Sequence, residues 1–233
     1  MNIIDIAILA LFALFFLSGW YRGFLSTVLS IGSFLVSWVS GMLFLPLVSS
    51  AIMGHERLFN MMLYYTEGSE YIGSIEYANR AISSISAADL SNIVSEANLP
   101  YPMGKAVTAN IAREAFAADG ITTLGDYFNQ TIVCVAVNIL SFLIIFAVVR
   151  LILAFVIHCV DHARTLPVLR MADGPIGAGF GLLRGMLAVF VLFMLAPLAM
   201  TILPEQLNVV IEESFFAPFF YHSNFLLGLI PGT

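Results

Sequence analysis

The chain has 233 residues, of which 60% are hydrophobic and only 10% are charged, and its formal net charge is −6. A soluble globular protein has about 45–50% apolar and about 25% charged residues, so a water-soluble fold of this length could not bury the apolar excess. The composition thus excludes an ordinary soluble domain and indicates a protein whose surroundings are the lipid bilayer. The negative net charge and the lack of a basic patch argue against a nucleic-acid partner.

Four apolar stretches come close to or exceed the length of about 20 residues that a transmembrane helix needs. They lack the strict polar–apolar alternation that is typical of membrane strands, so we expect helices. The first stretch lacks the basic leading region and the cleavage site of a secretory signal peptide, and we interpret it as a retained helix. The sequence therefore predicts an all-α membrane protein with two hairpins of transmembrane helices, at residues 3–18 (extendable to 21), 24–47, 131–157 and 176–203.

The long connection between the second and third stretches has a different composition. Residues 48–130 contain nine acidic and four basic residues. Their apolar residues recur at helical spacing, which predicts short amphipathic helices that pack on the bundle or lie at the interface, without forming a separate domain. Ser86 and Asp89 have the spacing of a helix capping box. The sequence Leu-Pro-Tyr-Pro at 99–102 predicts a break between two of these helices.

The end of the chain is first acidic and then aromatic, and Pro218 interrupts it. We expect a pair of interfacial helices here rather than a fifth span. The sequence thus divides into a first transmembrane hairpin (1–47), a polar helical excursion (48–130), a second transmembrane hairpin (131–203) and an interfacial tail (204–233).

Basic residues in short connections predict the orientation, because they collect on the cytoplasmic side of the membrane. Arg22 lies between the first two stretches, and Arg164 and Arg170 lie between the last two. The excursion and the tail carry net negative charge. We therefore expect both termini outside the cytoplasm.

A short motif, G-x-x-R-G-x-L, occurs twice, each time where a helix leaves the predicted cytoplasmic face. This recurrence indicates two hairpins with the same orientation. The two copies place their glycines and arginine at Gly19, Arg22 and Gly23, and at Gly181, Arg184 and Gly185.

Small residues mark one face on each of two stretches. Gly177, Gly181 and Gly185 are four residues apart, which lets another helix approach closely. The second stretch has a seam of serines with alternating spacings of four and three, typical of a coiled-coil seam. We expect the second and fourth helices to pack through these faces, and a glycine-lined substrate path is the alternative. The seam consists of Ser26, Ser30, Ser33, Ser37 and Ser40.

Several polar residues interrupt the apolar stretches. Arg22 and Arg184 could hold an anionic ligand or a lipid head group, but we favour side chains that extend to the head-group region and set the topology. Arg150 is a candidate functional residue, because an ionisable group within a membrane helix is costly. Asn138 also interrupts the third stretch, and Asp5 lies at the outer end of the first.

Two acidic residues, Asp161 and Asp173, are conceivable partners of Arg150, whereas Asp5 lies at the opposite end of its helix and should not reach it. His158, Asp161 and His162 share a helical face, yet no further ligand follows at useful spacing, and we expect neither a metal site nor a cofactor. We interpret Cys134 and Cys159 as packing residues, since neither has a visible base. Nucleophile, phosphate-binding and dinucleotide motifs are lacking, so we do not expect an enzyme.

Two regions together resemble the colicin V production protein (CvpA) family. The first region has Asp5, an apolar helix and then Gly19-x-x-Arg22-Gly23-Phe24. The second runs from Asn138 through Arg150 and a short connector to a glycine-rich helix with Gly177, Gly181, Arg184 and Gly185. The resemblance covers roughly residues 1–47 and 130–200.

The resemblance implies a bacterial inner-membrane protein that is linked to toxin production or export and to envelope function, and it supplies no catalytic residues. We therefore expect a non-enzymatic helical bundle that acts through membrane or envelope protein partners or through lipid, and that can form a homo-oligomer. The alternative is a small transporter or channel subunit that works as an oligomer. A membrane-tethered enzyme is the least favoured interpretation.

Overall fold

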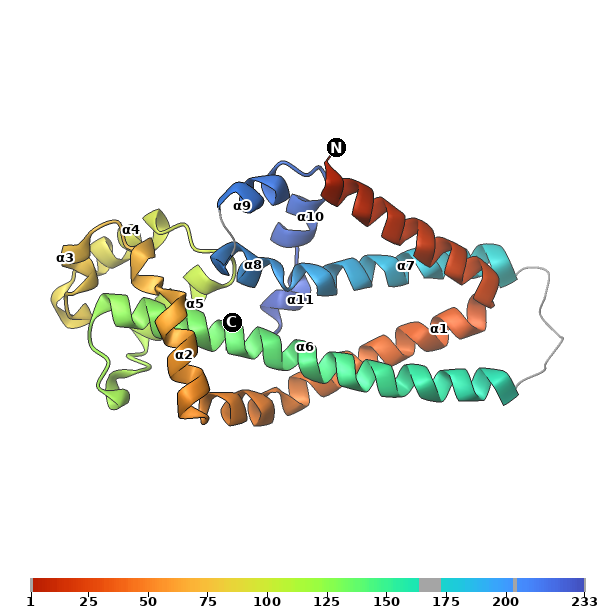
Figure 1. Ribbon diagram of the computed structural model, residues 1–233, viewed down its shortest axis with the longest axis horizontal. Helices are drawn as coiled ribbons and strands as arrows, with labels where there is room; N and C mark the ends of the chain where they lie inside the picture. Colours follow the sequence, from red (N-terminus) through yellow and green to blue (C-terminus); the bar gives the residue numbers. More distant parts are fainter. Residues whose placement is uncertain (1, 164–172, 203–204, 233) are drawn as a thin grey trace. The chain divides into compact units, whose positions relative to one another are not determined.

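The computed structural model describes residues 2–163, 173–202 and 205–232, and these residues form an all-helical protein. Three helices are much longer than the others (Figure 1): α1 (Ile3–Met53), α6 (Leu124–Ala163) and α7 (Asp173–Phe193). By length and composition, three apolar segments are suited to crossing a bilayer, at Ile3–Met53, Leu124–His158 and Gly174–Thr201. The prediction of an all-α protein with long apolar helices is thereby confirmed, and the count of four transmembrane helices stays a prediction.

Short helices make up most of the rest of the chain. The excursion contains α2 (Glu56–Thr66), α3 (Ile75–Ala78), α4 (Ala87–Glu96) and α5 (Met103–Ala112), with 3₁₀ turns at Gly68–Tyr71, Ile82–Ser84 and Ala117–Asp119. The end of the chain contains α8 (Ala196–Ile202), α9 (Glu205–Glu212), α10 (Ala217–His222) and α11 (Phe225–Gly228).

A sharp bend at Gly23 divides α1 into two helical segments. Gly23 has φ 79° and ψ 174°, a conformation that essentially only glycine adopts. The chain therefore reverses direction without a loop (Figure 1). We call residues 3–22 the first segment and residues 24–53 the second segment. At ~1.5 Å per residue the first segment is about 30 Å long, which is the thickness of a bilayer core.

The chain forms two compact units, which we describe separately. The first unit comprises residues 1–45, 142–196 and 205–226, and the second comprises residues 46–141, 197–204 and 227–233. The boundary between them falls inside α1 and again inside α6. The four-part division derived from the sequence stays a prediction.

Aromatic side chains hold the helices of the first unit together. Trp38 and Phe34 on the second segment of α1 meet Phe142 and Phe146 on α6, with ring centroids 4.7 and 5.2 Å apart. Since the residue numbers rise along one helix as they fall along the other, the two helices run antiparallel. Aromatic pairs at such distances contribute about 0.5–1.5 kcal/mol beyond the area they bury.

The tail of the chain takes part in the packing of the first unit. Phe220 on α10 lies 5.0 Å from Phe190 on α7, and Phe225 lies 5.5 Å from the same ring. Phe220 and Tyr221 are buried, whereas Phe215 and Phe219 are exposed. The aromatic residues of the tail are therefore partly packing residues, and the interfacial location of the tail stays a prediction.

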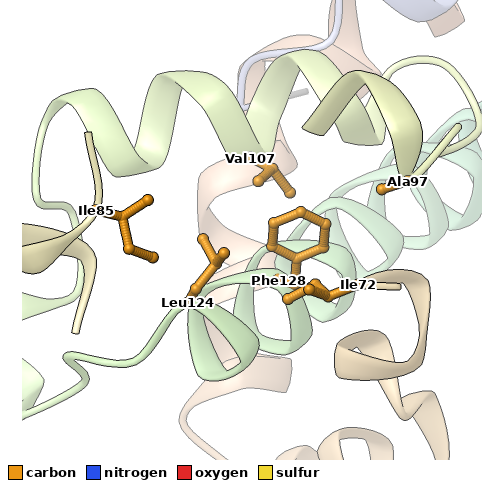
Figure 2. Close-up of a cluster of buried hydrophobic side chains, with 6 residues drawn as sticks. All are labelled: Ile72, Ile85, Ala97, Val107, Leu124 and Phe128. Carbon is orange, nitrogen blue, oxygen red and sulfur yellow. The ribbon is translucent and has the colours of Figure 1, made fainter. Parts of the chain in front are cut away.

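The second unit has a hydrophobic cluster of its own (Figure 2), formed by Ile72, Ile85, Ala97, Val107, Leu124 and Phe128. Leu124 and Phe128 belong to α6 and are fully buried, which explains why this helix begins earlier than the predicted residue 131. The excursion helices thus pack around the start of α6. Ser86 is the N-cap of α4, since its hydroxyl accepts a hydrogen bond from the backbone N–H of Asp89 and donates one to the Asp89 carboxylate. The break at 99–102 separates α4 from α5.

Candidate functional site

A polar pocket of about 670 Å³ lies within the first unit, between the second segment of α1 and the last turns of α6. The two helices contribute residues at helical spacing, so that each presents one continuous face. The pocket is lined by Arg22, Ser26, Ser30 and Ser33 from α1 and by Arg150, Ala154, Ile157 and His158 from α6. Arg22 lies next to the bend at Gly23, which places it at the end of the pocket where α1 reverses.

Serines of the second segment hold Arg150 in place. One terminal nitrogen of its guanidinium, Nη1, donates to the backbone carbonyl oxygen of Ser30 at 2.8 Å and to the hydroxyl of Ser33. The other, Nη2, donates to the hydroxyl of Ser30 at 2.9 Å. The side chains of the conceivable partners Asp161 and Asp173 lie outside the described residues.

A second arginine, Arg184 on α7, reaches the same serine. Its Nη1 lies 3.3 Å from the hydroxyl oxygen of Ser30, and its Nη2 lies 3.1 Å from that of Ser18. Its guanidinium carbon stands 4.7 Å from the ring centroid of Phe15, a cation–π contact. Arg184 is only 8% exposed, and its Nε has no hydrogen-bond partner among the described residues. The expectation that Arg184 extends to the head-group region is therefore wrong, because the close approach of α7 and α1 turns it inward.

The third arginine, Arg22, is exposed and lines the pocket. It interacts electrostatically with Arg184, as does Arg150. Within the described part of the chain, no acidic side chain lines the pocket or forms an ion pair with any of the three arginines. The three side chains together form what we call the arginine cluster.

The glycines explain how α7 comes so close to α1. A β-carbon on Gly19 would overlap the carbonyl oxygen of Gly177 and lie 3.0 Å from the α-carbon of Gly181. A β-carbon on Gly177 would lie 2.8 Å from the carbonyl carbon of Gly23, and one on Gly185 would lie 3.1 Å from the β-carbon of Phe15. The two copies of the G-x-x-R-G-x-L motif therefore meet at Gly19 and Gly181, and α7 runs antiparallel to the first segment.

This packing corrects one inference from the sequence. The glycine face of α7 meets the first segment of α1, not the serine seam of the second. The seam instead directs Ser30 and Ser33 toward the arginines, because their hydroxyls are acceptors that a charged guanidinium can use away from water. The seam was identified in the sequence, but its role as a hydrogen-bond partner was missed, as were the contacts of Phe15 and Ser18.

Asp5 is fully buried at the other end of the first segment, where it joins the start of the chain to its tail. Its carboxylate accepts hydrogen bonds from the hydroxyl of Ser214 at 2.6 Å and from the backbone N–H groups of Phe215 and Phe216 at 2.9 and 3.0 Å. It also accepts one from the N–H of Asn2. Asp5 thus caps the entry to α10, which is a structural role.

The remaining candidates have separate places. Asn138 belongs to the second unit, where its side-chain amide lies 3.4 Å from the carbonyl oxygen of Gly232. His158 lines the pocket, whereas the side chains of Asp161, His162 and Cys159 lie outside the described residues. The described residues contain no cluster of three metal-binding side chains. Cys134 is half-buried in α6.

Comparison with known proteins assigns the family. The family model described as "Colicin V production protein" matches residues 4–86 and 115–224. The match includes both segments of α1, α6, α7 and the arginine cluster, and it leaves out α4 and α5. No curated protein and no solved structure matches the chain. Because the matched residues make up most of the sequence, the chain belongs to the colicin V production protein family.

Proposed function

We propose that this protein is a non-enzymatic, multi-pass protein of the bacterial inner membrane that supports toxin production or secretion, or envelope homeostasis. The family match carries this proposal. The arginine cluster supports it, since ionisable groups among apolar helices are costly and are kept for a function. The protein acts through membrane or envelope partners, and the membrane-facing apolar surface of the helices allows it to form a homo-oligomer.

The proposed topology has four crossings with both termini outside the cytoplasm. The two segments of α1 supply two crossings, because the bend at Gly23 reverses the chain, and α6 and α7 supply the others. Arg22, Arg164 and Arg170 then lie on the cytoplasmic side, in agreement with the distribution of basic residues in membrane proteins.

Cysteine accessibility in whole cells tests this topology. In a background without Cys134 and Cys159, single cysteines replace Ser69, Thr165 and Ser223. Labelling from outside at 69 and 223, with protection at 165, is the expected result. Labelling at 165 alone would invert the orientation.

The proposed role is tested by complementation. A strain without its own copy of the gene receives the wild-type protein, Arg150→Gln or, as a control with the same charge change, Arg113→Gln. Arg113 is exposed in the second unit and lies outside the pocket. We expect wild type and Arg113→Gln to restore toxin secretion or resistance to detergent, and Arg150→Gln to fail at equal membrane abundance. Full rescue by Arg150→Gln would contradict a role for the cluster.

The alternative function is a small transporter or channel subunit that acts as an oligomer. The polar pocket between the second segment of α1 and α6 favours it, since polar pathways through membranes are lined in this way. Solute flux in proteoliposomes that is lost in Arg150→Ala or Gly181→Leu would favour this alternative over a purely supporting role.

A further inference from the structure

We infer that the pocket beside the arginine cluster binds a phosphate-type oxyanion, supplied either by a free phosphate compound or by a lipid head group. The inference goes beyond the proposed function, because the binding concerns the purified protein and does not depend on toxin production. It is carried by three arginines that gather in one unit and by the pocket onto which two of them open.

The positive charge of the arginine cluster favours the binding of an anion. Arg22 and Arg150 both act electrostatically on Arg184, and like charges repel more strongly where water is scarce. The described residues offer serine hydroxyls, a carbonyl oxygen and an aromatic ring to these guanidinium groups, but no carboxylate. These neutral partners accept hydrogen bonds from the guanidinium groups but do not cancel their positive charge. A bound anion would therefore reduce the repulsion among the three arginines.

The geometry favours phosphate over a simple halide ion. Arg150 is fixed in one orientation by three hydrogen bonds to Ser30 and Ser33, so little side-chain entropy is lost when a ligand binds. Arg22 lines the pocket, is exposed and forms no hydrogen bond with a described residue, which leaves its planar fork available. A planar guanidinium fork matches two oxygens of one phosphate group.

The pocket is larger than a lone phosphate needs. Its volume of about 670 Å³ is in the range of sites for small organic molecules. Along the second segment of α1 it extends from Ser26 to Ser33, which corresponds to about 10 Å of helix. Ala154 and Ile157 give it an apolar wall beside the polar one. These features suit a phosphate that carries an organic substituent, such as a phosphate ester or a phospholipid.

Two binding arms distinguish the sources of the phosphate. In the first, inorganic phosphate is titrated calorimetrically into the full-length protein in a phosphate-free maltoside detergent at constant chloride. In the second, the protein is transferred to nanodiscs of phosphatidylcholine and phosphatidylglycerol, and native mass spectrometry measures the lipid that stays bound. Arg22→Gln is the main variant, since Arg22 has no hydrogen bond with a described residue whose loss would disturb folding, and Arg113→Gln is the matched control.

We expect saturable binding in at least one arm, weakened about tenfold or more by Arg22→Gln and by Arg150→Gln, and unchanged by Arg113→Gln. Binding of inorganic phosphate in the phosphate-free detergent assigns a free phosphate compound as the source. Retention of phosphatidylglycerol alone assigns a lipid head group. A lack of binding in both arms, or equal binding by wild type and both pocket variants, would overturn the inference. Neither result depends on the complementation assay, so failure here is distinguishable from failure of the proposed function.

Discussion

Arg150 donates hydrogen bonds to both the backbone carbonyl oxygen and the hydroxyl oxygen of Ser30, at 2.8 and 2.9 Å. The same hydroxyl also lies 3.3 Å from a terminal nitrogen of Arg184. One serine on α1 thereby joins α6 and α7 in the first unit. Hydrogen bonds to charged groups contribute about 1.5–3 kcal/mol each, so this residue should matter for stability as well as for the pocket.

Ser30→Ala should destabilise the protein by about 2 kcal/mol, because it removes an acceptor that two guanidinium groups share. The measurement is unfolding in detergent followed by tryptophan fluorescence, to which the buried Trp38 contributes. Ser40→Ala is the matched control, since Ser40 belongs to the same seam and is only partly buried, with no side-chain hydrogen bond to a described residue. Equal effects of the two substitutions would show that the seam serves general packing only.

Gly181→Ala should destabilise the protein by about 1–3 kcal/mol or more, because its β-carbon would overlap the carbonyl oxygen of Phe15 and force α7 away from α1. Gly179 lies on the same helix, and a β-carbon there would meet nothing within 4 Å. Gly179→Ala should therefore be neutral or slightly stabilising, as alanine favours helix. Thermal unfolding of the two variants under one condition makes the comparison, and a similar loss in both would count against direct helix contact at Gly181.

The sequence was informative about the helices and less so about their partners. Long apolar stretches are directly visible in the sequence, so the long apolar helices and a short connection at Arg22 were predicted. The face with Gly177, Gly181 and Gly185 indicates that another helix packs closely against it. Small residues permit contact with any helix, however, and do not specify which helix it is. The burial of Arg184 depends on the rotation of α7, which a single sequence does not reveal.

Asp5 is a stronger case of a role that the sequence could not show. Its partners Ser214, Phe215 and Phe216 lie more than 200 positions away in the chain, with separations of 209, 210 and 211. No local pattern connects residues at such a distance. The early start of α6 at Leu124 has a similar cause, since it depends on the hydrophobic cluster of the second unit (Figure 2).

Asp5→Ala should loosen the tail, because it leaves the backbone N–H groups of Phe215 and Phe216 without their acceptor. Hydrogen exchange followed by mass spectrometry should show exchange at these two amides that is about tenfold faster or more. Exchange in the second unit should stay unchanged.

Glu213→Ala is the control for this experiment, since Glu213 is an exposed acid in the same tail. It should leave exchange at Phe215 and Phe216 close to that of the wild type. If the two variants loosen the tail equally, net charge rather than the hydrogen bonds of Asp5 holds it in place.

Gly23→Ala tests whether the bend in α1 is required. An alanine would have to adopt φ 79° and ψ 174°, which costs about 1–3 kcal/mol or more for a residue with a β-carbon, and the backbone of Gly23 is also in close contact with Gly177. We expect lower thermal stability and loss of binding at the arginine cluster, because Arg22 directly precedes the bend. Gly32→Ala is the control, since Gly32 is helical and a β-carbon there would meet nothing within 4 Å. Wild-type stability of Gly23→Ala would mean that the two segments of α1 tolerate a different connection, and that the reversal does not depend on glycine.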